Sequence, residues 1–474
     1  MEHVHASRLD SFPPYDEAEL DRLLDREIAA DPHKIVVLDD DPTGVQTVHD
    51  ISVFTDWTPE SIEQGFDESV KVFYILTNSR GLTQDETTRI HRDIAARVAA
   101  VAARKKRPWL IMSRSDSTLR GHYPLETELL RDEIEKSGVR VDGEILCPFF
   151  KEGGRYTLDN VHYVRYGDDL VPAGETEFAR DKTFGYTKSN LCDYVEEKTG
   201  GRYPARDVIC VSLDDLRACA FDKIEKQLLG AHDFQKIVVN AVDYSDVKAF
   251  CIPLYRAMAR GGHFVFRTAA ALVKVLGGIS TIPLLTRDQM VGETTGRGGM
   301  IVVGSHTRKT TAQLNRLLDL PGVRGIEFNS DLVLESDEAL RNEVRRVVAE
   351  SEKLIEQGIT PVCYTKRTLI SLATDSGQDA LVRSVKISDA VQSLVGGLTV
   401  KPAFVIAKGG ITSSDVGVKA LKVRRANVMG QIRPGIPVWQ TDSQSKFPGI
   451  PYVIFPGNVG EENTLREAVE ILIG

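Results

Sequence analysis

The stretch KIVVLDDDPTG, Lys34–Gly44, decides the fold class of the first half of the chain. Its apolar run, Ile35–Leu38, indicates a buried strand, and three aspartates and a Pro-Thr-Gly turn follow directly. Ligands of open α/β sheets bind beyond the carboxyl ends of strands, so we interpret the aspartates as part of a site. A solvated turn with a capping Asp is the plain alternative. Strand alternation predicts that Asp39 and Asp41 point one way and Asp40 the other.

Two further strands of the first half also end in polar residues. FYILTNSRG, Phe73–Gly81, places Arg80 after an apolar run, and its planar guanidinium can pair bidentately with a substrate carboxylate. WLIMSRSDSTLRGH, Trp109–His122, ends in a dense set of donors and acceptors suited to an anionic polyol: Arg114, Ser115, Asp116, Ser117 and Arg120. An ordinary surface arginine would also fit the second stretch. Three such strand ends in one domain predict a shared pocket.

Three stretches of the second half run from an apolar strand through glycine to hydroxyl residues or a helix start. They are FVIAKGGITSSD (Phe404–Asp415), MIVVGSHTRKT (Met300–Thr310) and VIFPGNVG (Val453–Gly460). Glycine lets the backbone approach a ligand closely, and the N–H groups of a helix start favour an anion. Neither GxxxxGK[ST] nor GxGxxG occurs, so these turns alone do not identify a nucleotide site.

Apolar runs alternate with amphipathic stretches along the whole chain, which predicts an α/β fold. The strands are expected at Ile35–Leu38, Val72–Leu76, Trp109–Met112, Glu144–Phe149, Ile237–Asn240, His263–Arg267, Met300–Val303, Pro361–Tyr364, Ala403–Ala407 and Tyr452–Phe455. Helices are expected at Asp85–Lys105 and Glu461–Ile473. The polar, weakly periodic segment 151–201 is interpreted as an irregular, functional loop region.

The glycine-rich stretch Val291–Gly299 is the expected domain boundary. It separates a first domain, 34–290, from a second, 300–474, and residues 1–33 are expected to form an N-terminal helical extension. A length of 474 residues agrees with two or three domains.

Charge and composition exclude several classes of protein. The formal net charge is −9, which argues against a nucleic-acid partner. No apolar run is long enough to span a bilayer, and no signal peptide is recognisable, so we expect a cytoplasmic protein without a membrane partner. The six scattered cysteines contain no CxxC pair and are expected to be reduced thiols. We find no pattern for a metal site made by the protein alone.

Together these motifs resemble the four-carbon acid sugar kinase family, whose members phosphorylate threonate, erythronate or oxo-tetronates with ATP. The resemblance runs from Lys34 to the C-terminus. It rests on DDPTG (Asp40–Gly44), NSR (Asn78–Arg80), SRSDSTLRG (Ser113–Gly121), GSHT (Gly304–Thr307), GGITS (Gly409–Ser413), RPGIPVW (Arg433–Trp439) and PGNVG (Pro456–Gly460).

The resemblance implies an N-terminal substrate domain, a C-terminal nucleotide domain and an active site in the cleft between them. The family's acid-sugar contacts correspond to Asp41, Arg80, Arg114, Ser115, Asp116 and Ser117. Its ATP contacts correspond to Ser305, Gly409, Gly410, Ile411, Thr412 and Gly457. It further implies Mg²⁺ bound with ATP, transfer to the terminal hydroxyl, and a homodimer as one expected assembly.

Either Asp41 or Asp116 can serve as the general base, and the hydroxyl and guanidinium neighbours of Asp116 favour it. Asp41 then orients the substrate, while Asp40 serves structure or the metal. Many family members have GGETS where this chain has Ile411, Lys-Ser where it has Phe455–Pro456, and Lys where it has Arg114. These departures indicate a distinct branch.

Two other functions compete with the kinase. Asp39-x-Asp41 after a strand, with Thr77 ending another, resembles haloacid-dehalogenase-type phosphatases, in which the first Asp is the nucleophile. That alternative leaves the second half of the chain unexplained. A non-enzymatic sugar-acid sensor would need the substrate pocket but not the anion-binding loops of the second half.

Overall fold

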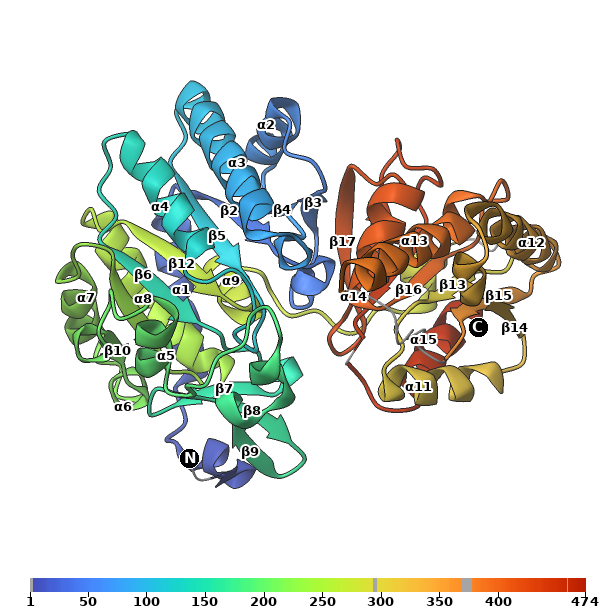
Figure 1. The fold of residues 1–474 in the computed structure, drawn as a ribbon. Helices are drawn as coiled ribbons and strands as arrows, with labels where there is room; N and C mark the ends of the chain where they lie inside the picture. Colours follow the sequence, from blue (N-terminus) through green and yellow to red (C-terminus); the bar gives the residue numbers. More distant parts are fainter. Residues whose placement is uncertain (1–2, 293–295, 368–376, 458) are drawn as a thin grey trace. The chain divides into compact units, whose positions relative to one another are not determined.

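A computed structural model describes residues 3–292, 296–367, 377–457 and 459–474. By internal contacts the chain forms two compact units. The first comprises Met1–Gly44 and Asp56–Ser280, and the second comprises Val45–Thr55 and Thr281–Gly474. Both are helix-covered sheets, which confirms the predicted α/β class (Figure 1).

The first unit is built on a parallel sheet of strand order β10-β11-β6-β12-β5-β2-β4. Its strands are β2 (Lys34–Asp39), β4 (Val72–Leu76), β5 (Trp109–Arg114), β6 (Gly143–Cys147), β10 (Ile209–Val211), β11 (Gln235–Val239) and β12 (Phe264–Thr268). Parallel strands are buried on both faces, and β2 is buried throughout, as its apolar run predicts. Every strand predicted in this half is present, with its ends shifted by no more than a few residues.

Helices cover both faces of this sheet (Figure 1). Packed together on one face are α2 (Pro59–Asp67), α3 (Gln84–Lys105) and α4 (Leu125–Lys136), and on the other α1 (Glu17–Ala30), α7 (Phe221–Leu229), α8 (Tyr244–Ala259) and α9 (Ala270–Leu276). The short helices α5 (Leu191–Lys198) and α6 (Leu213–Arg217) complete the unit. Helix α3 confirms the predicted 85–105 helix; a capping box of Thr83 and Glu86 begins it, and Ile94 and Val98 face the core.

Segment 151–201 contains regular structure, and the expectation of an irregular loop there is wrong. It forms β7 (Arg155–Leu158), β8 (Val161–Tyr166) and β9 (Asp169–Pro172), which pair antiparallel with one another and with β1 (Val4–His5), followed by α5. The strands are short and joined by tight turns, so they leave little periodicity in the sequence.

The second unit has a mixed sheet of order β3-β17-β18-β19-β16-β13-β15-β14. Its strands are β3 (Ile51–Phe54), β13 (Met300–Val303), β14 (Val323–Phe328), β15 (Thr360–Thr365), β16 (Val405–Lys408), β17 (Arg425–Arg433), β18 (Ile436–Thr441) and β19 (Pro451–Phe455). Strands β14, β15, β13, β16 and β19 run parallel, and the three others are antiparallel. The four strands predicted in this half are present.

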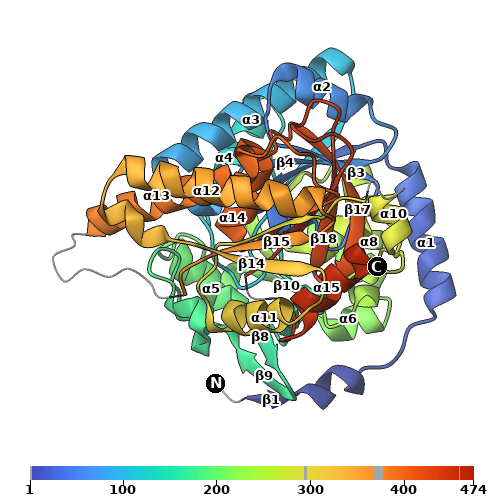
Figure 2. The same cartoon turned by 90° about the vertical axis from the view of Figure 1, so that its right-hand side faces the viewer.

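Helices of the second unit also form two layers (Figure 2). One contains α12 (Asp337–Glu356), α13 (Gly377–Gly396) and α14 (Gly410–Asp415); the other contains α10 (Arg287–Val291), α11 (Arg308–Leu318) and α15 (Thr464–Ile473). Helix α15 confirms the predicted final helix, although it begins three residues late. Its Leu465 and Val469 enter a core with Ile301, Ile406 and Val453 from the central strands.

Residues 45–55, assigned to the first domain from the sequence, lie in the second unit. There β3 pairs antiparallel with β17, and Gln46 Nε2 donates to the Gly435 carbonyl at 3.1 Å. The two units separate at Ser280, before the expected 291–299 boundary, of which residues 293–295 lie outside the described residues. None of the described helices is long and apolar enough to cross a membrane.

Candidate active site

Three adjacent strands of the first unit, β5, β2 and β4, end at one edge of the sheet. Their register pairs Asp39 with both Leu76 and Arg114. Each of the three predicted polar stretches therefore begins beside the other two. The predicted substrate residues come together because they follow neighbouring strands, although three separate parts of the chain supply them.

Arg80 lies at the centre of this cluster. Its Nη2 and Nε donate to the two oxygens of Asp40 at 2.6 and 3.2 Å, and its Nη1 is 3.4 Å from Asp41 and 3.8 Å from Asp116. The alternation prediction, which put Asp40 and Asp41 on opposite faces, is wrong. Strand β2 ends at Asp39, and the chain then turns into a 3₁₀ turn, Pro42–Val45, so the strand period no longer applies.

Asp39 is buried beneath the cluster around Arg80. It is 1% exposed, and Arg114 Nη1 is 3.3 Å from its Oδ1. A Cβ on Gly44 would lie 1.9 Å from Asp39 Oδ2, so only glycine allows the turn to close over this carboxyl. Burial, with the nearby charges of Asp40 and Asp41, raises the pKa of Asp39 to about 7, against the opposing effect of Arg114.

Asp41 and Asp116 differ in how tightly they are held. Asp41 accepts from the Thr43 backbone N–H at 2.8 Å and faces Arg80. Asp116 accepts from Arg120 Nε at 2.7 Å and, through a short hydrogen bond, from the Thr118 hydroxyl. Burial alone would raise the pKa of either carboxyl, but these donors and Arg80 outweigh it and lower both pKa values, that of Asp116 far more strongly.

The loop that carries Ser115, Asp116 and Ser117 is fixed mainly through its backbone. Three of its backbone carbonyls accept hydrogen bonds from buried side chains. The carbonyl of Ser117 accepts from His162 at 2.8 Å, that of Thr118 from the Tyr186 hydroxyl at 2.7 Å, and that of Leu119 from the Tyr194 hydroxyl at 2.9 Å. The Ser115 hydroxyl donates to Glu126 at 3.4 Å, and Ser79 donates to the same carboxylate at 2.6 Å. Sequence reasoning missed His162, Glu126, Tyr186 and Tyr194, since none of them lies in a strand-end motif.

In the second unit, β19, β16 and β13 are neighbours, so their three following loops also meet. Ser305 Oγ accepts from the Thr310 hydroxyl at 3.1 Å, and the same hydroxyl lies 3.3 Å from the Gly457 carbonyl. A Cβ on Gly457 would be 3.7 Å from Ser305 Oγ and 4.0 Å from Gly409 Cα. Predicted nucleotide residues from all three stretches are thereby brought together.

The middle loop connects β16 to α14. Gly409 has φ +119°, a conformation that side-chain-bearing residues rarely adopt, and Gly410 begins the helix. Thr412 is buried against Gly304, where a Cβ would lie 2.2 Å from the Thr412 hydroxyl. Ile411, by contrast, is 70% exposed, which leaves an apolar side chain available to a ligand at this loop.

Lys408, the last residue of β16, is a buried cation that sequence reasoning missed. It is fully buried, its Nζ donates to the Pro456 carbonyl at 2.5 Å and the Gly457 carbonyl at 3.3 Å, and it lies 4.3 Å from the centre of the Phe455 ring. Burial, assisted by Lys309, lowers its pKa to about 7. The lysine therefore joins the loop after β19 to the end of β16. In the sequence, a charged residue at the end of an apolar strand is the feature that could have indicated it.

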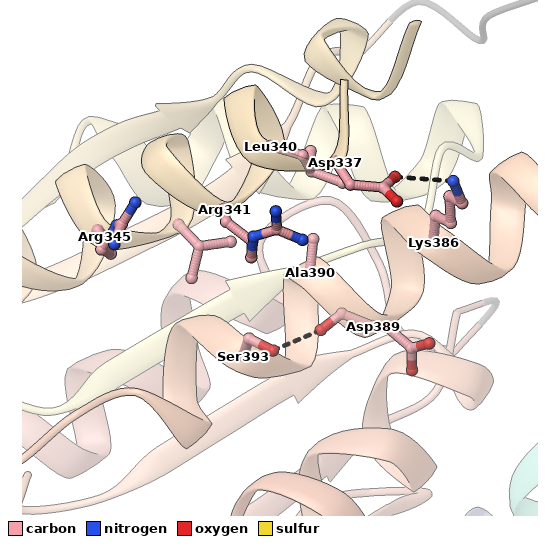
Figure 3. Close-up of a pocket in the computed structure, with 9 residues that line it drawn as sticks. Asp337, Leu340, Arg341, Arg345, Lys386, Asp389, Ala390 and Ser393 are labelled. Atoms are coloured by element: carbon pink, nitrogen blue, oxygen red, sulfur yellow. Dashed lines mark hydrogen bonds and ion pairs between the residues drawn. The ribbon is translucent and has the colours of Figure 1, made fainter. Parts of the chain in front are cut away.

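A separate pocket lies between α12 and α13 (Figure 3). Two pairs of its polar groups bind one another: Lys386 pairs with Asp337 at 2.7 Å, and Ser393 donates to the Asp389 carbonyl at 2.7 Å. None of the sequence-predicted site residues lines it. We therefore assign this pocket no part in the candidate site.

Comparison with known families assigns both halves of the chain. A sugar-binding N-terminal domain matches residues 35–276, and a nucleotide-binding C-terminal domain matches residues 300–465. The chain belongs to the four-carbon acid sugar kinase family. This confirms the resemblance and the predicted order of its two domains, with the arginine–aspartate cluster in the sugar-binding domain and the glycine loops in the nucleotide-binding domain.

Solved structures of other proteins share the fold. A Haemophilus influenzae protein is 18% identical, with TM-score 0.59, and the match covers 92% of this chain and 100% of that one. A Salmonella typhimurium LT2 protein, provisionally named a tRNA synthase, is 15% identical, with TM-score 0.65 and coverage of 92% and 98%. At these identities the likeness concerns the fold alone. The search of curated proteins finds no match.

Proposed function

We propose that this member of the family is an ATP-dependent kinase that phosphorylates the terminal hydroxyl of threonate, erythronate or an oxo-tetronate. The observation that carries the proposal is the pair of strand-end clusters, one in each unit. The first combines aspartates with arginines, as an anionic polyol requires, and the second combines glycines with hydroxyls, as phosphates require. Cytoplasmic location, and a homodimer as one expected assembly, stay predictions.

Phosphoryl transfer requires positioning, charge neutralisation and a group that accepts the hydroxyl proton. Arg80, Arg114, Ser115 and Ser117 support binding of the sugar acid. Asp41 is the better candidate for the base, in place of Asp116. Both oxygens of Asp116 form ion pairs, with Arg120 and Arg80, whereas the described residues give Asp41 one ion pair, with Arg80 Nη1 at 3.4 Å. A carboxylate whose pKa is strongly lowered accepts a proton poorly, so Asp116 suits orientation of the substrate.

Ser305, Gly409, Gly410, Ile411, Thr412 and Gly457 are the proposed ATP contacts. These six residues offer hydroxyls, carbonyls and backbone N–H groups, and none of them carries a carboxylate. Such a set fits Mg²⁺ that arrives with the phosphates and keeps most of its ligands from them and from water. Bound in this way, the ion would neutralise charge on the transferred phosphoryl group.

The contacts give no support to the phosphatase alternative. Its nucleophile would be Asp39, which is buried, paired with Arg114 and closed off by Gly44. A carboxylate in that position cannot reach a substrate phosphorus without rearrangement of the turn. The glycine loops of the second unit also have no role in that reaction, nor in a simple sensor.

Purified protein should be incubated with Mg-ATP and separately with D- and L-threonate, D- and L-erythronate and their oxo analogues. Phosphorylated acid and ADP are expected in equal amounts with at least one of them. If none is phosphorylated, the proposed substrate class is wrong. Release of phosphate from a four-carbon sugar phosphate without ATP would favour the phosphatase, and binding of the acid without turnover would favour the sensor.

A further inference from the structure

Five arginines surround the strand-end cluster of the first unit, and four of them contact a carboxylate. These pairs are Arg80 with Asp40 at 2.6 Å, Arg114 with Asp39 at 3.3 Å, Arg120 with Asp116 at 2.7 Å and Arg267 with Glu126 at 3.6 Å. In particular, Asp40 already occupies the Nε/Nη2 edge of the Arg80 guanidinium. Since Arg80 Nη1 in turn faces Asp41 and Asp116, a substrate carboxylate that paired bidentately with Arg80 would compete with these aspartates.

Arg155 is the fifth arginine. It begins β7, and its guanidinium lies over the ring of Phe178 at 5.5 Å, the same ring that Arg120 covers at 5.1 Å. Because Arg120 binds Asp116 directly, this shared ring places Arg155 beside the predicted substrate loop. Within the described residues, no carboxylate oxygen lies within 4.0 Å of the Arg155 nitrogens, and its buried Nε has no hydrogen-bond partner.

The electrostatics agree with this geometry. Burial lowers the pKa of Arg155, and Arg120 adds to that effect, while the charge of Asp116 opposes it from a distance. Glu177, another acid whose charge acts on Arg155, accepts a hydrogen bond from the Tyr166 hydroxyl at 2.6 Å instead. A largely buried cation without a carboxylate partner is unfavourable, and an anionic ligand would relieve that cost.

We propose that Arg155 binds the carboxylate of the sugar acid; this inference rests on the proposed kinase function. The planar guanidinium of an arginine matches a carboxylate in shape, and the guanidinium of Arg155 is not already occupied by an aspartate. Asp41 and Asp116 then face the hydroxyl groups of the substrate, and Arg80 holds these two aspartates in place. Arg155 would thereby select acids over neutral four-carbon polyols.

Calorimetry on the full-length protein tests this assignment. The probes are D- and L-threonate and D- and L-erythronate, the neutral polyols threitol and erythritol, and ATP. Arg155→Met is expected to lose about 30-fold or more in affinity for the acid that the parent protein binds, with polyol and ATP affinities unchanged. Arg165→Met is the matched control, because Arg165 lies on β8 of the same sheet and is exposed. It should bind the acid as the parent does.

Arg155→Lys keeps the charge but loses the fork, and it decides the matter if Arg155→Met does not fold. A loss of about tenfold in acid affinity is then expected. Acid affinity equal to that of the parent in a folded Arg155 variant would overturn the assignment, as would a parent that binds none of the acids. The proposed kinase function fails separately, if the parent binds an acid but never phosphorylates it.

Discussion

Arg80 donates to both carboxylate oxygens of Asp40, from Nη2 at 2.6 Å and from Nε at 3.2 Å. This pair fixes the arginine so that its remaining edge faces Asp41 and Asp116. Four charged groups from the loops after three adjacent strands thus depend on one another. The arrangement makes Arg80 an organiser of the substrate site as well as a candidate ligand.

Arg80→Lys should severely impair the site, since an ammonium cannot replace the fork and leaves three carboxylates close together. We expect kcat/KM for the sugar acid to fall, and the fall should correspond to a loss of about 2–5 kcal/mol in transition-state stabilisation. Steady-state kinetics with a saturating concentration of Mg-ATP measures it. Arg104→Lys is the control, because Arg104 forms an exposed pair with Glu63. Near-normal kcat/KM in Arg80→Lys would contradict the organising role.

The two candidate bases should respond differently to loss of charge. Asp41→Asn is expected to lower kcat by about 10²–10⁴ with little change in acid affinity. Asp116→Asn should also weaken acid binding, because Asp116 holds Arg120 and faces Arg80. Kinetics and calorimetry on both variants separate the roles. The opposite pattern would make Asp116 the base, and near-normal kcat in both would place the base elsewhere.

Gly410→Val should weaken ATP binding by about tenfold or more, because a branched side chain would stand at the start of α14, where the backbone has to approach the phosphates. Sugar-acid binding, in the other unit, should be retained. Gly396→Ala is the control, since its Cβ would meet only ordinary contacts of 3.5 Å or more. Unchanged nucleotide affinity in folded Gly410→Val would remove this loop from the ATP site.

Lys408→Met removes the donor that joins the middle and last loops. The buried Pro456 carbonyl then loses the Lys408 donor, and the Gly457 carbonyl keeps only the Thr310 hydroxyl of its two side-chain donors, at a cost of about 1–3 kcal/mol in the free energy of unfolding. ATP affinity should fall as well, because the loop that carries Gly457 is held less firmly. Denaturant unfolding and calorimetry measure the two effects. Lys401→Met is the control, as this exposed lysine also donates to a carbonyl, that of Pro448 at 2.7 Å; equal effects in both variants would count against Lys408.

His162 predicts a pH dependence of stability. Burial lowers its folded-state pKa to about 4, against about 6.5 in the unfolded chain, so between these values the unfolded state binds more protons. The neutral histidine makes its full contribution to the free energy of unfolding above pH 6.5. That contribution is lost as the pH falls from 6.5 through 4, and the total loss is about 3 kcal/mol.

Denaturant unfolding of the parent and of His162→Gln at several pH values tests this. The stability difference between the two proteins should shrink as pH falls from 6.5 to 4. Asp39, whose raised pKa acts in the opposite direction, contributes equally to both proteins and cancels. His232→Gln, at an exposed position, is the matched control. A difference that stays constant across the window would show that His162 does not titrate in it.

Local sequence patterns were sufficient to predict the strands that build the two central sheets and the polar stretches that follow them. An apolar run such as Ile35–Leu38 can be stable only when buried, and strand ends are where an α/β sheet binds ligands. The motifs also indicated the family, which both domain matches confirm. What each motif residue contacts was not predictable in this way.

Only the tertiary structure decided the partners. Asp40 and Asp41 meet the same arginine because the chain turns after Asp39, and β3, distant in sequence from the rest of the second unit, pairs there with β17. Arg155 comes beside Asp116 through the antiparallel β7–β8 pair and the ring of Phe178, neither of which leaves a periodic signal. Such pairings depend on contacts between residues far apart in the chain, and their energies exist only once the chain has folded.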